Sequence, residues 1–170
     1  MLTFKRCDSN DSDFQALVRE LDRYLALIDG EEHAFYAQYN KTDSIKHVVL
    51  AYLDGRAVAC GAFKPYGEKG VEIKRMYAAP DLRGQGLASK ILQELENWAA
   101  SLGYQLCVLE TGKRQADAVR LYEKNGYHVI PNYGQYVEAH NSVCYEKRIG
   151  SDSVEHANVN AGDIQDLTPA

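Results

Sequence analysis

The sequence is poor in several features that define other classes of protein. It has 4 cysteines in 170 residues, and no two of them are close enough for a CxxC pair or for the ligand spacing of a zinc site. No run approaches the roughly 18 apolar residues that cross a membrane, and the first residues lack the apolar stretch of a secretory signal. We therefore expect a cytoplasmic protein with reduced thiols, no metal and no membrane association.

An excess of positive charge is also missing. The net charge of −5 argues against a broad nucleic-acid-binding surface. Residues 151–170 contain four acidic residues but no lysine, arginine or aromatic residue. Such a composition is typical of a disordered segment. The expected organisation is one domain over residues 1–150, long enough to bury a sizeable core, followed by a disordered acidic tail over 151–170.

The hydrophobic pattern predicts a mixed α/β domain. Helices are expected over 12–28, with Ser12 as the cap, and over 31–39, 87–102 and 115–125. Strands are expected over 47–53, 56–63, 71–77, 104–111, 127–130 and 142–147. Asp54-Gly55 predicts a hairpin between the first two strands. With one β-α-β step over 71–111, this order predicts a mixed, mostly antiparallel central sheet.

The third strand alternates in a way that predicts its two faces. Residues 71, 73, 75 and 77 are expected on one face, and Glu72, Lys74 and Met76 on the other.

A glycine-containing segment, Arg83-Gly84-Gln85-Gly86-Leu87-Ala88, joins this strand to the longest helix of the second half. Two glycines let the backbone turn sharply and expose successive N–H groups. The helix start adds unpaired N–H groups and a positive dipole end, and Arg83 adds a cation. Together these features predict a diphosphate site that needs no metal, although a plain glycine turn with a surface arginine is an alternative. The dinucleotide-binding fingerprint is disfavoured because Ser89 stands where its third glycine would be.

These residues resemble the GNAT superfamily of N-acetyltransferases. Arg83-x-x-Gly86-x-Ala88 matches the family's [Gln/Arg]-x-x-Gly-x-[Gly/Ala] signature, and the helix that carries Tyr122 and ends at Gly126-Tyr127 is similar to its second landmark. The resemblance covers roughly residues 2–149, and it implies an acyl-CoA N-acyltransferase fold whose β-α-β core binds acetyl-CoA. The cofactor-binding residues that it implies are Met76, Tyr77, Ala78, Arg83, Gly84, Gln85, Gly86, Leu87, Ala88 and, where the family often has Asn, Gln115.

Acetyl transfer to an amine needs a group that removes a proton from the amine and benefits from one that protonates the sulfur. By its position in the family pattern, Tyr122 is the candidate donor to sulfur; alternatively it is a packed core aromatic. Glu72 is the candidate base, acting through water from the predicted face of Met76. It could instead be a solvated strand residue or pair with Lys74. The resemblance also implies a backbone N–H near Met76 for the carbonyl oxygen.

The acceptor side is less well defined by the sequence. Asp29, Glu31 and Glu32 could bind a cationic substrate or form a solvated helix start. The tyrosine-rich stretch 127–136 could line the acceptor pocket, form a subunit contact in a homodimer, or pack on the core. The predicted function is acetyl-CoA-dependent N-acetyl transfer to a primary amine of a small molecule or peptide, by direct attack. The alternative is a non-catalytic CoA-binding or interaction module of the same fold.

Overall fold

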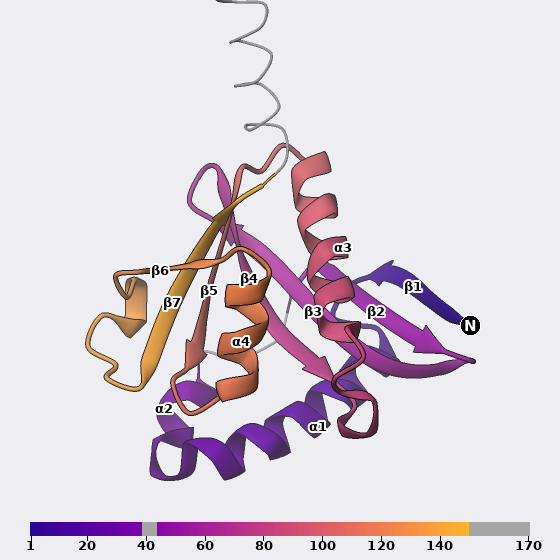
Figure 1. The fold of residues 1–170 in the computed structure, drawn as a ribbon, viewed down its shortest axis with the longest axis horizontal. Coiled ribbons are helices and arrows are strands. Elements are labelled where there is room, and N and C mark those ends of the chain that lie inside the picture. The colour runs from indigo at the N-terminus through magenta and orange to yellow at the C-terminus, as the bar shows by residue number, and fades with distance from the viewer. Residues whose placement is uncertain (39–43, 150–170) are drawn as a thin grey trace, which may run out of the picture.

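The computed structural model describes residues 1–38 and 44–149, which form a sheet with helices packed on it (Figure 1). The strands are β1 (Leu2–Cys7), β2 (His47–Leu53), β3 (Arg56–Tyr66), β4 (Gly70–Ala78), β5 (Leu106–Gly112), β6 (His128–Ile130) and β7 (Ser142–Arg148). The helices are α1 (Ser12–Asp29), α2 (His33–Ala37), α3 (Leu87–Ser101) and α4 (Ala116–Lys124), with 3₁₀ turns η1 (Gly30–Glu32), η2 (Pro80–Leu82) and η3 (Gly134–Tyr136). The tail expected over 151–170 lies outside the described residues, as does residue 39 of the second expected helix.

The sheet is mixed and mostly antiparallel, as the sequence predicts. Its strand order is β1-β2-β3-β4-β5-β7-β6. Neighbouring strands are antiparallel except β4 and β5, which are parallel and are connected through α3. The hairpin prediction is confirmed, because Asp54 and Gly55 have the positive φ angles, 50° and 86°, of such a turn. The sequence does not predict β1, because this edge strand is largely exposed and lacks an alternating apolar pattern.

Two hydrophobic clusters lie on opposite faces of the sheet. On one face, α3 packs through Ile91, Leu92 and Leu95, joined by Tyr122 of α4. On the other face, α1 packs through Phe14, Leu17, Leu21 and Leu25. The cap of α1 is Asp11 rather than the expected Ser12, because the Asp11 carboxylate accepts from the first free amides of the helix. In the described part of the chain, no helix is long and apolar enough to cross a membrane.

A β-bulge interrupts β4 at Arg75. The pairing of β3 with β4 shifts by one residue at Gly61, which faces both Arg75 and Met76. Arg75 has a left-handed φ of 60°. A side chain on Gly61 would collide with Met76 and α3, since a Cβ there would lie 2.5 Å from the Met76 sulfur and 2.8 Å from a Leu95 methyl. The bulge therefore depends on a glycine in the neighbouring strand.

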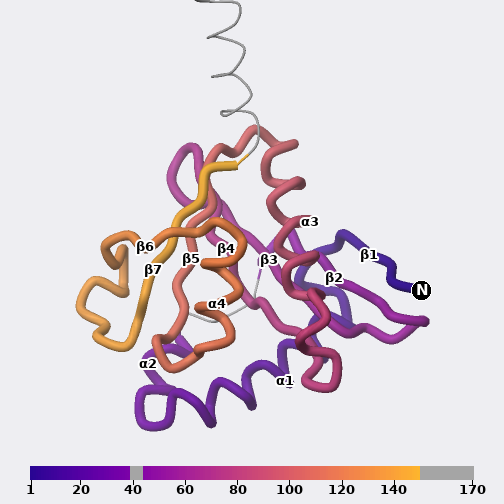
Figure 2. The backbone as a smooth tube through the Cα atoms, in the orientation of Figure 1, coloured from indigo at the N-terminus to yellow at the C-terminus, as the bar shows by residue number. Residues whose placement is uncertain are grey.

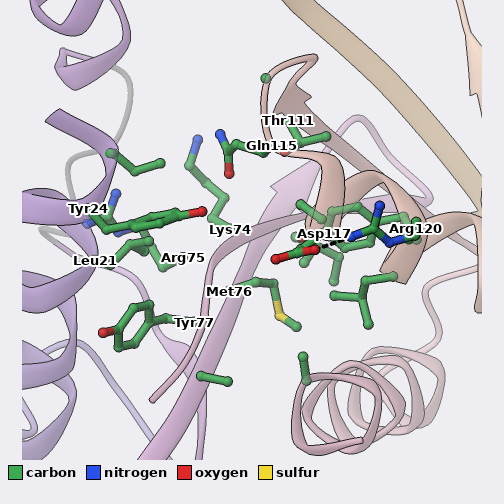
Figure 3. Close-up of a pocket in the computed structure, with 18 of the residues that line it drawn as sticks. Leu21, Tyr24, Lys74, Arg75, Met76, Tyr77, Thr111, Gln115, Asp117 and Arg120 are labelled. Carbon is green, nitrogen blue, oxygen red and sulfur yellow. Dashed lines mark hydrogen bonds and ion pairs between the residues drawn. The ribbon is translucent and has the colours of Figure 1, made fainter. Parts of the chain in front are cut away.

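The bulge overturns the predicted alternation beyond Lys74. Arg75 forms an ion pair with Asp22 of α1, and Tyr77 packs in the cluster of α1. Met76 packs in the cluster of α3 instead, and Figure 3 shows Tyr77 reaching toward α1 while Met76 points away from it. The expectation that Glu72 and Met76 share a face is therefore wrong, because one extra residue reverses the side-chain phase of a strand.

The parallel strands β4 and β5 stay paired over a short distance. Pairing runs from Gly70–Leu106 to Glu72–Val108, whereas β5 continues to pair with β7 as far as Gly112. The two strands then diverge, as the ribbon and the backbone trace both show (Figures 1 and 2). The later residues of β4 consequently have no ladder partner on β5, and their polar backbone groups on that side are available to a ligand.

Candidate functional site

A cavity of about 540 Å³ opens where β4 and β5 diverge. Its walls come from α1, β4, the turn after η2, the start of α3, β5 and α4 (Figure 3). Of the predicted site residues, Gln85 alone does not line this cavity, and it is exposed. The structure thus brings the predicted cofactor residues and both predicted catalytic residues to one place. In residues 1–38 and 44–149, no three metal-ligating side chains gather as a metal site.

At one end the cavity meets the glycine turn and the first turn of α3. Gly84 and Gly86 have φ angles of 82° and 80°, and a Cβ on either would have no protein atom within 4 Å. No side chain caps α3 at Gly86, so the first amides of the helix are open to a ligand. A helix start with free amides and open space in front of it suits a diphosphate.

Arg83 is exposed but anchored beside this turn. Its Nε donates a hydrogen bond of 3.0 Å to the carbonyl oxygen of Ala78. Its guanidinium lies 5.1 Å from the ring centroid of Tyr24 and 5.5 Å from that of Tyr77. These contacts hold a permanent cation at the rim of the cavity, unlike a freely moving surface arginine.

Helix α4 forms the opposite wall. Gln115 lines the cavity at the start of this helix. Arg120 and Lys124, which the sequence analysis did not single out, line it one turn apart. Near α3, Asn125 donates a hydrogen bond of 3.0 Å to Ser89. The two cations could not be identified in advance, because which face of α4 meets the cavity depends on how the helix packs.

Tyr122 belongs both to the core and to the cavity wall. Its side chain packs against Tyr127 and Tyr145, with ring centroids 5.8 and 6.2 Å away, and it also lines the cavity. Burial, with the charge of Glu110 nearby, raises the pKa of its phenol well above the usual range. The phenol therefore stays protonated at neutral pH and is able to donate a hydrogen bond.

Glu72 is buried, with 4% of its surface exposed. Tyr133 donates a hydrogen bond of 2.8 Å to one carboxylate oxygen, and the Lys74 ammonium lies 3.6 Å from the other. Burial lowers the pKa of Lys74, and the charge of Glu72 opposes this shift. The interpretation of Glu72 as a solvated residue is therefore wrong, and the pairing with Lys74 is confirmed.

Glu110 of β5 is a carboxylate that the sequence analysis missed, and it lines the same cavity. Ser142 donates a hydrogen bond of 2.6 Å to it. Burial raises the pKa of Glu110 to about 7; Ser142 and Lys74 oppose the shift, while Glu72 and Asp29 add to it. A carboxylate with this pKa can exchange a proton near neutrality. The available signal was an acid within a strand that is otherwise apolar.

The three residues of the predicted acidic cluster have different positions relative to the inner end of the cavity. Asp29 is buried and lines the cavity, whereas Glu31 is exposed. Glu32 forms an ion pair of 3.5 Å with Arg114. From the tyrosine-rich stretch, Tyr136 lines the cavity. One acid of the three and part of the tyrosine-rich stretch thus face the space where an acceptor would lie.

A mixed sheet that splays beside an uncapped, glycine-preceded helix start defines the acyl-CoA N-acyltransferase fold. Comparison with known families leads to the same class. The chain belongs to the Acetyltransferase (GNAT) family, whose profile matches residues 14–127. It is an acetyltransferase, as its relatives are.

Relatives of known sequence and structure agree with this assignment. An IAA acetyltransferase from Azospirillum brasilense is 35% identical over 123 residues, which cover 71% of this chain and 80% of the relative. The structure of a proposed acyl-CoA N-acyltransferase from Klebsiella pneumoniae superimposes with a TM-score of 0.74 and 31% identity, covering 88% of this chain and 98% of the other. A GNAT acetyltransferase from Elizabethkingia anophelis, solved with acetyl-CoA bound, shares the fold with a TM-score of 0.63 and 15% identity, covering 87% of this chain and 98% of the other.

Proposed function

We propose that this protein transfers the acetyl group of acetyl-CoA to a primary amine by direct attack of the amine on the thioester. One observation carries the proposal. A single cavity connects the uncapped start of α3 to Glu110, a half-buried carboxylate whose pKa is raised to about 7. The first end suits a diphosphate, and the second suits removal of a proton from an amine.

Acetyl-CoA supplies an acetyl group that is activated as a thioester. In this proposal the turn at 83–86 and the first amides of α3 bind the diphosphate, with Arg83 beside them. The pantetheine arm follows β4 from Met76 to Ala78, a proposal that the missing ladder partner on β5 supports. Lys124 adds positive charge from α4, whereas the charge of Arg120 is balanced by its ion pair with Asp117.

Glu110 is the proposed proton acceptor. An amine arrives mostly as an ammonium at neutral pH and has to lose a proton before it can attack. Among the described residues, no cation forms an ion pair with Glu110, so its carboxylate is free to take that proton. Glu72 is the weaker candidate because Tyr133 and Lys74 already contact its two oxygens.

The transfer itself exchanges one bond for another. The amine nitrogen forms a bond to the acetyl carbonyl carbon, and the bond from that carbon to sulfur breaks. A backbone N–H near Met76 stabilises the carbonyl oxygen as negative charge develops on it. The departing sulfur takes the proton of the Tyr122 hydroxyl. The new amide nitrogen then loses a second proton, which restores the phenol through water, and Glu110 returns its proton to solvent.

Release of the CoA thiol tests the proposal. With acetyl-CoA and a panel of primary amines, amino acids and peptides, we expect thiol release that depends on the acceptor, and an acceptor whose mass increases by one acetyl group. Calorimetry with CoA measures cofactor binding separately. A protein that binds CoA but releases no thiol above the acceptor-free rate with any amine would contradict the proposal and favour the non-catalytic CoA-binding module.

A further inference from the structure

The inner end of the cavity carries more negative charge than removal of one proton requires. Three carboxylates line it: Asp29 at the end of α1, Glu72 on β4 and Glu110 on β5. Within the described residues, Glu72 alone of these has a cation in an ion pair, namely Lys74. In this part of the chain, Asp29 and Glu110 therefore meet the cavity without a cation at ion-pair distance.

Asp29 is the less expected of the two unpaired acids. It is 8% exposed, and in the described part of the chain no side chain or amide donates a hydrogen bond to its carboxylate. Burial raises its pKa, and the charges of His33 and Arg114 oppose the shift only partly. Arg114 instead donates to the backbone carbonyls of Ile28 and Asp29, at 3.4 and 3.5 Å. Because no protein group among the described residues pairs with this carboxylate where it meets the cavity, a cation from a ligand would complete the position.

The geometry of α1 directs Asp29 to the cavity. Leu21, Leu25 and Asp29 follow one another at four-residue spacing and all line the cavity, so they share one face of the helix. Asp29 ends α1, whose last turn has no basic residue, and the negative end of the helix dipole adds to its attraction for a cation. Figure 1 shows this end of α1 near the C-terminal end of β5.

Asp29 and Glu110 line the same cavity, so both can act on one ligand there. The charge of Asp29 helps to raise the pKa of Glu110. Both carboxylates also help to raise the pKa of the Tyr36 phenol, which lines the cavity with them. An acceptor whose amino group lies at Glu110 can therefore reach Asp29 with a second group.

That second group is best matched by a cation. The reacting nitrogen has to be uncharged when it attacks, so it cannot remain the ionic partner of Asp29. An acceptor carboxylate is disfavoured, because the two cations that line this end, Lys74 and Arg75, are already paired with Glu72 and Asp22. Resting on the proposed function, we propose that the acceptor is a dibasic amine. One amino group reacts beside Glu110, and a second ammonium, which stays charged, binds Asp29 and the end of α1.

A homologous series of acceptors tests this proposal. The α,ω-diamines from 1,3-diaminopropane to 1,6-diaminohexane are compared with monoamines and amino alcohols of the same length, using CoA thiol release. We expect at least one diamine to have a kcat/KM about 10- to 100-fold above that of its monoamine, as for a buried charge-assisted contact. Asp29→Asn should remove this preference mainly through the KM for the diamine. Asp29→Glu should restore part of it, and the exposed-site control Glu31→Gln should keep it.

Binding of the best diamine to the CoA-loaded protein, measured by calorimetry, separates this proposal from the proposed function. Turnover of monoamines and diamines at equal efficiency, or a diamine preference that persists in folded Asp29→Asn, would overturn the dibasic acceptor and leave acetyl transfer intact. Diamine binding that depends on Asp29 but occurs without turnover would support the recognition site and contradict acetyl transfer. Absence of both would overturn both proposals. Melting curves establish that each variant is folded.

Discussion

At the scale of single residues, Glu72 and Glu110 are acids beside one cavity, but Glu72 is buried, Glu110 is half-buried, and their surroundings differ. Glu72 is held by Tyr133 and Lys74. Glu110 accepts a hydrogen bond from Ser142, and burial raises its pKa to about 7. The ionisable groups that face Glu110 come from several other elements. They are Asp29 of α1, Tyr36 of α2, Glu72 and Lys74 of β4, Tyr122 of α4 and Tyr136 of η3.

Glu110→Gln should lower kcat/KM by about 100-fold, the low end expected for loss of a general base. A carboxyl group with a raised pKa is ionised only above that pKa, so the parent's kcat/KM should rise with pH and bend near 7. This bend should disappear in Glu110→Gln. In Glu72→Gln it should persist and move to lower pH, because the charge of Glu72 helps to raise the pKa of Glu110. Loss of the bend in Glu72→Gln alone would return the base role to Glu72.

The pH dependence of the free energy of unfolding provides a second test with the same Glu110→Gln variant. The folded state holds the Glu110 proton more tightly than the unfolded state does, so the native protein loses stability as pH rises from the ordinary value, 4.5, through about 7. The variant should therefore match the parent near pH 4.5 and exceed it near pH 8, by up to about 3 kcal/mol. Chemical denaturation at the two pH values measures this difference.

Tyr122→Phe should lower kcat by about 10- to 100-fold with little change in the KM for acetyl-CoA. The substitution keeps the ring that packs against Tyr127 and Tyr145 and removes only the hydroxyl. The interaction with sulfur grows mainly in the transition state, so binding should be spared. Steady-state kinetics under conditions where chemistry limits the rate measure the effect. An unchanged kcat would leave Tyr122 as a core aromatic with no part in the reaction.

At the scale of elements, a side chain added to the glycine turn before α3 should hinder binding of acetyl-CoA sterically. Gly86→Val should raise the KM for acetyl-CoA at least about 10-fold, because the added side chain enters the open space in front of the helix start. Valine at a φ of 80° also strains the backbone by about 1–3 kcal/mol. Gly103→Val is a matched control, since Gly103 has a φ of 92°, equally open surroundings and a place at the other end of α3. An equal rise in KM for both variants would remove the turn from the cofactor site.

The packing of α3 on β3 depends on Gly61. Gly61→Ala should lower the free energy of unfolding by about 1–3 kcal/mol, because its Cβ would lie 2.8 Å from both Ile91 and Leu95 methyl groups. Leu95→Ala should also destabilise by creating a cavity. The double variant should lose less than the sum of the two, since the new methyl group occupies part of the vacated space. Denaturant titrations of the four proteins measure this coupling, and strict additivity would contradict the close contact.

At the scale of the whole molecule, the cavity is bounded by elements on both sides of the divergence between β4 and β5. A ligand that contacts both sides binds the folded state alone. CoA at about 100 times its Kd should stabilise the protein by about 2.7 kcal/mol. For a chain of this size that corresponds to a rise of roughly 5–10 °C in Tm. Thermal melts of Gly86→Val should show a much smaller rise and those of Gly103→Val a normal one; full stabilisation of Gly86→Val by CoA would contradict the proposed binding mode.

Much of the architecture could be predicted because its signals are local. Apolar spacing located the helices, Asp54-Gly55 located a hairpin, and Gly84 and Gly86 marked the turn whose positive φ angles the structure contains. The edge strand β1 was not predicted, because its exposed residues carry no alternating apolar pattern. The side-chain alternation of β4 beyond Lys74 was also not predicted, because the bulge depends on a glycine in a neighbouring strand.

The sequence by itself determined the family, the order of the main elements after β1 and the glycine turn, since each is encoded in neighbouring residues. The tertiary structure alone decided which acids face the cavity. Glu110, Asp29 and Glu72 come from three elements that meet only after the sheet forms. The raised pKa values of Glu110 and Asp29, and the ion pair of Glu72 with Lys74, follow from burial and from charges that the chain brings together across the fold. No spacing in the sequence records these distances, because desolvation and electrostatic energy depend on separation in space.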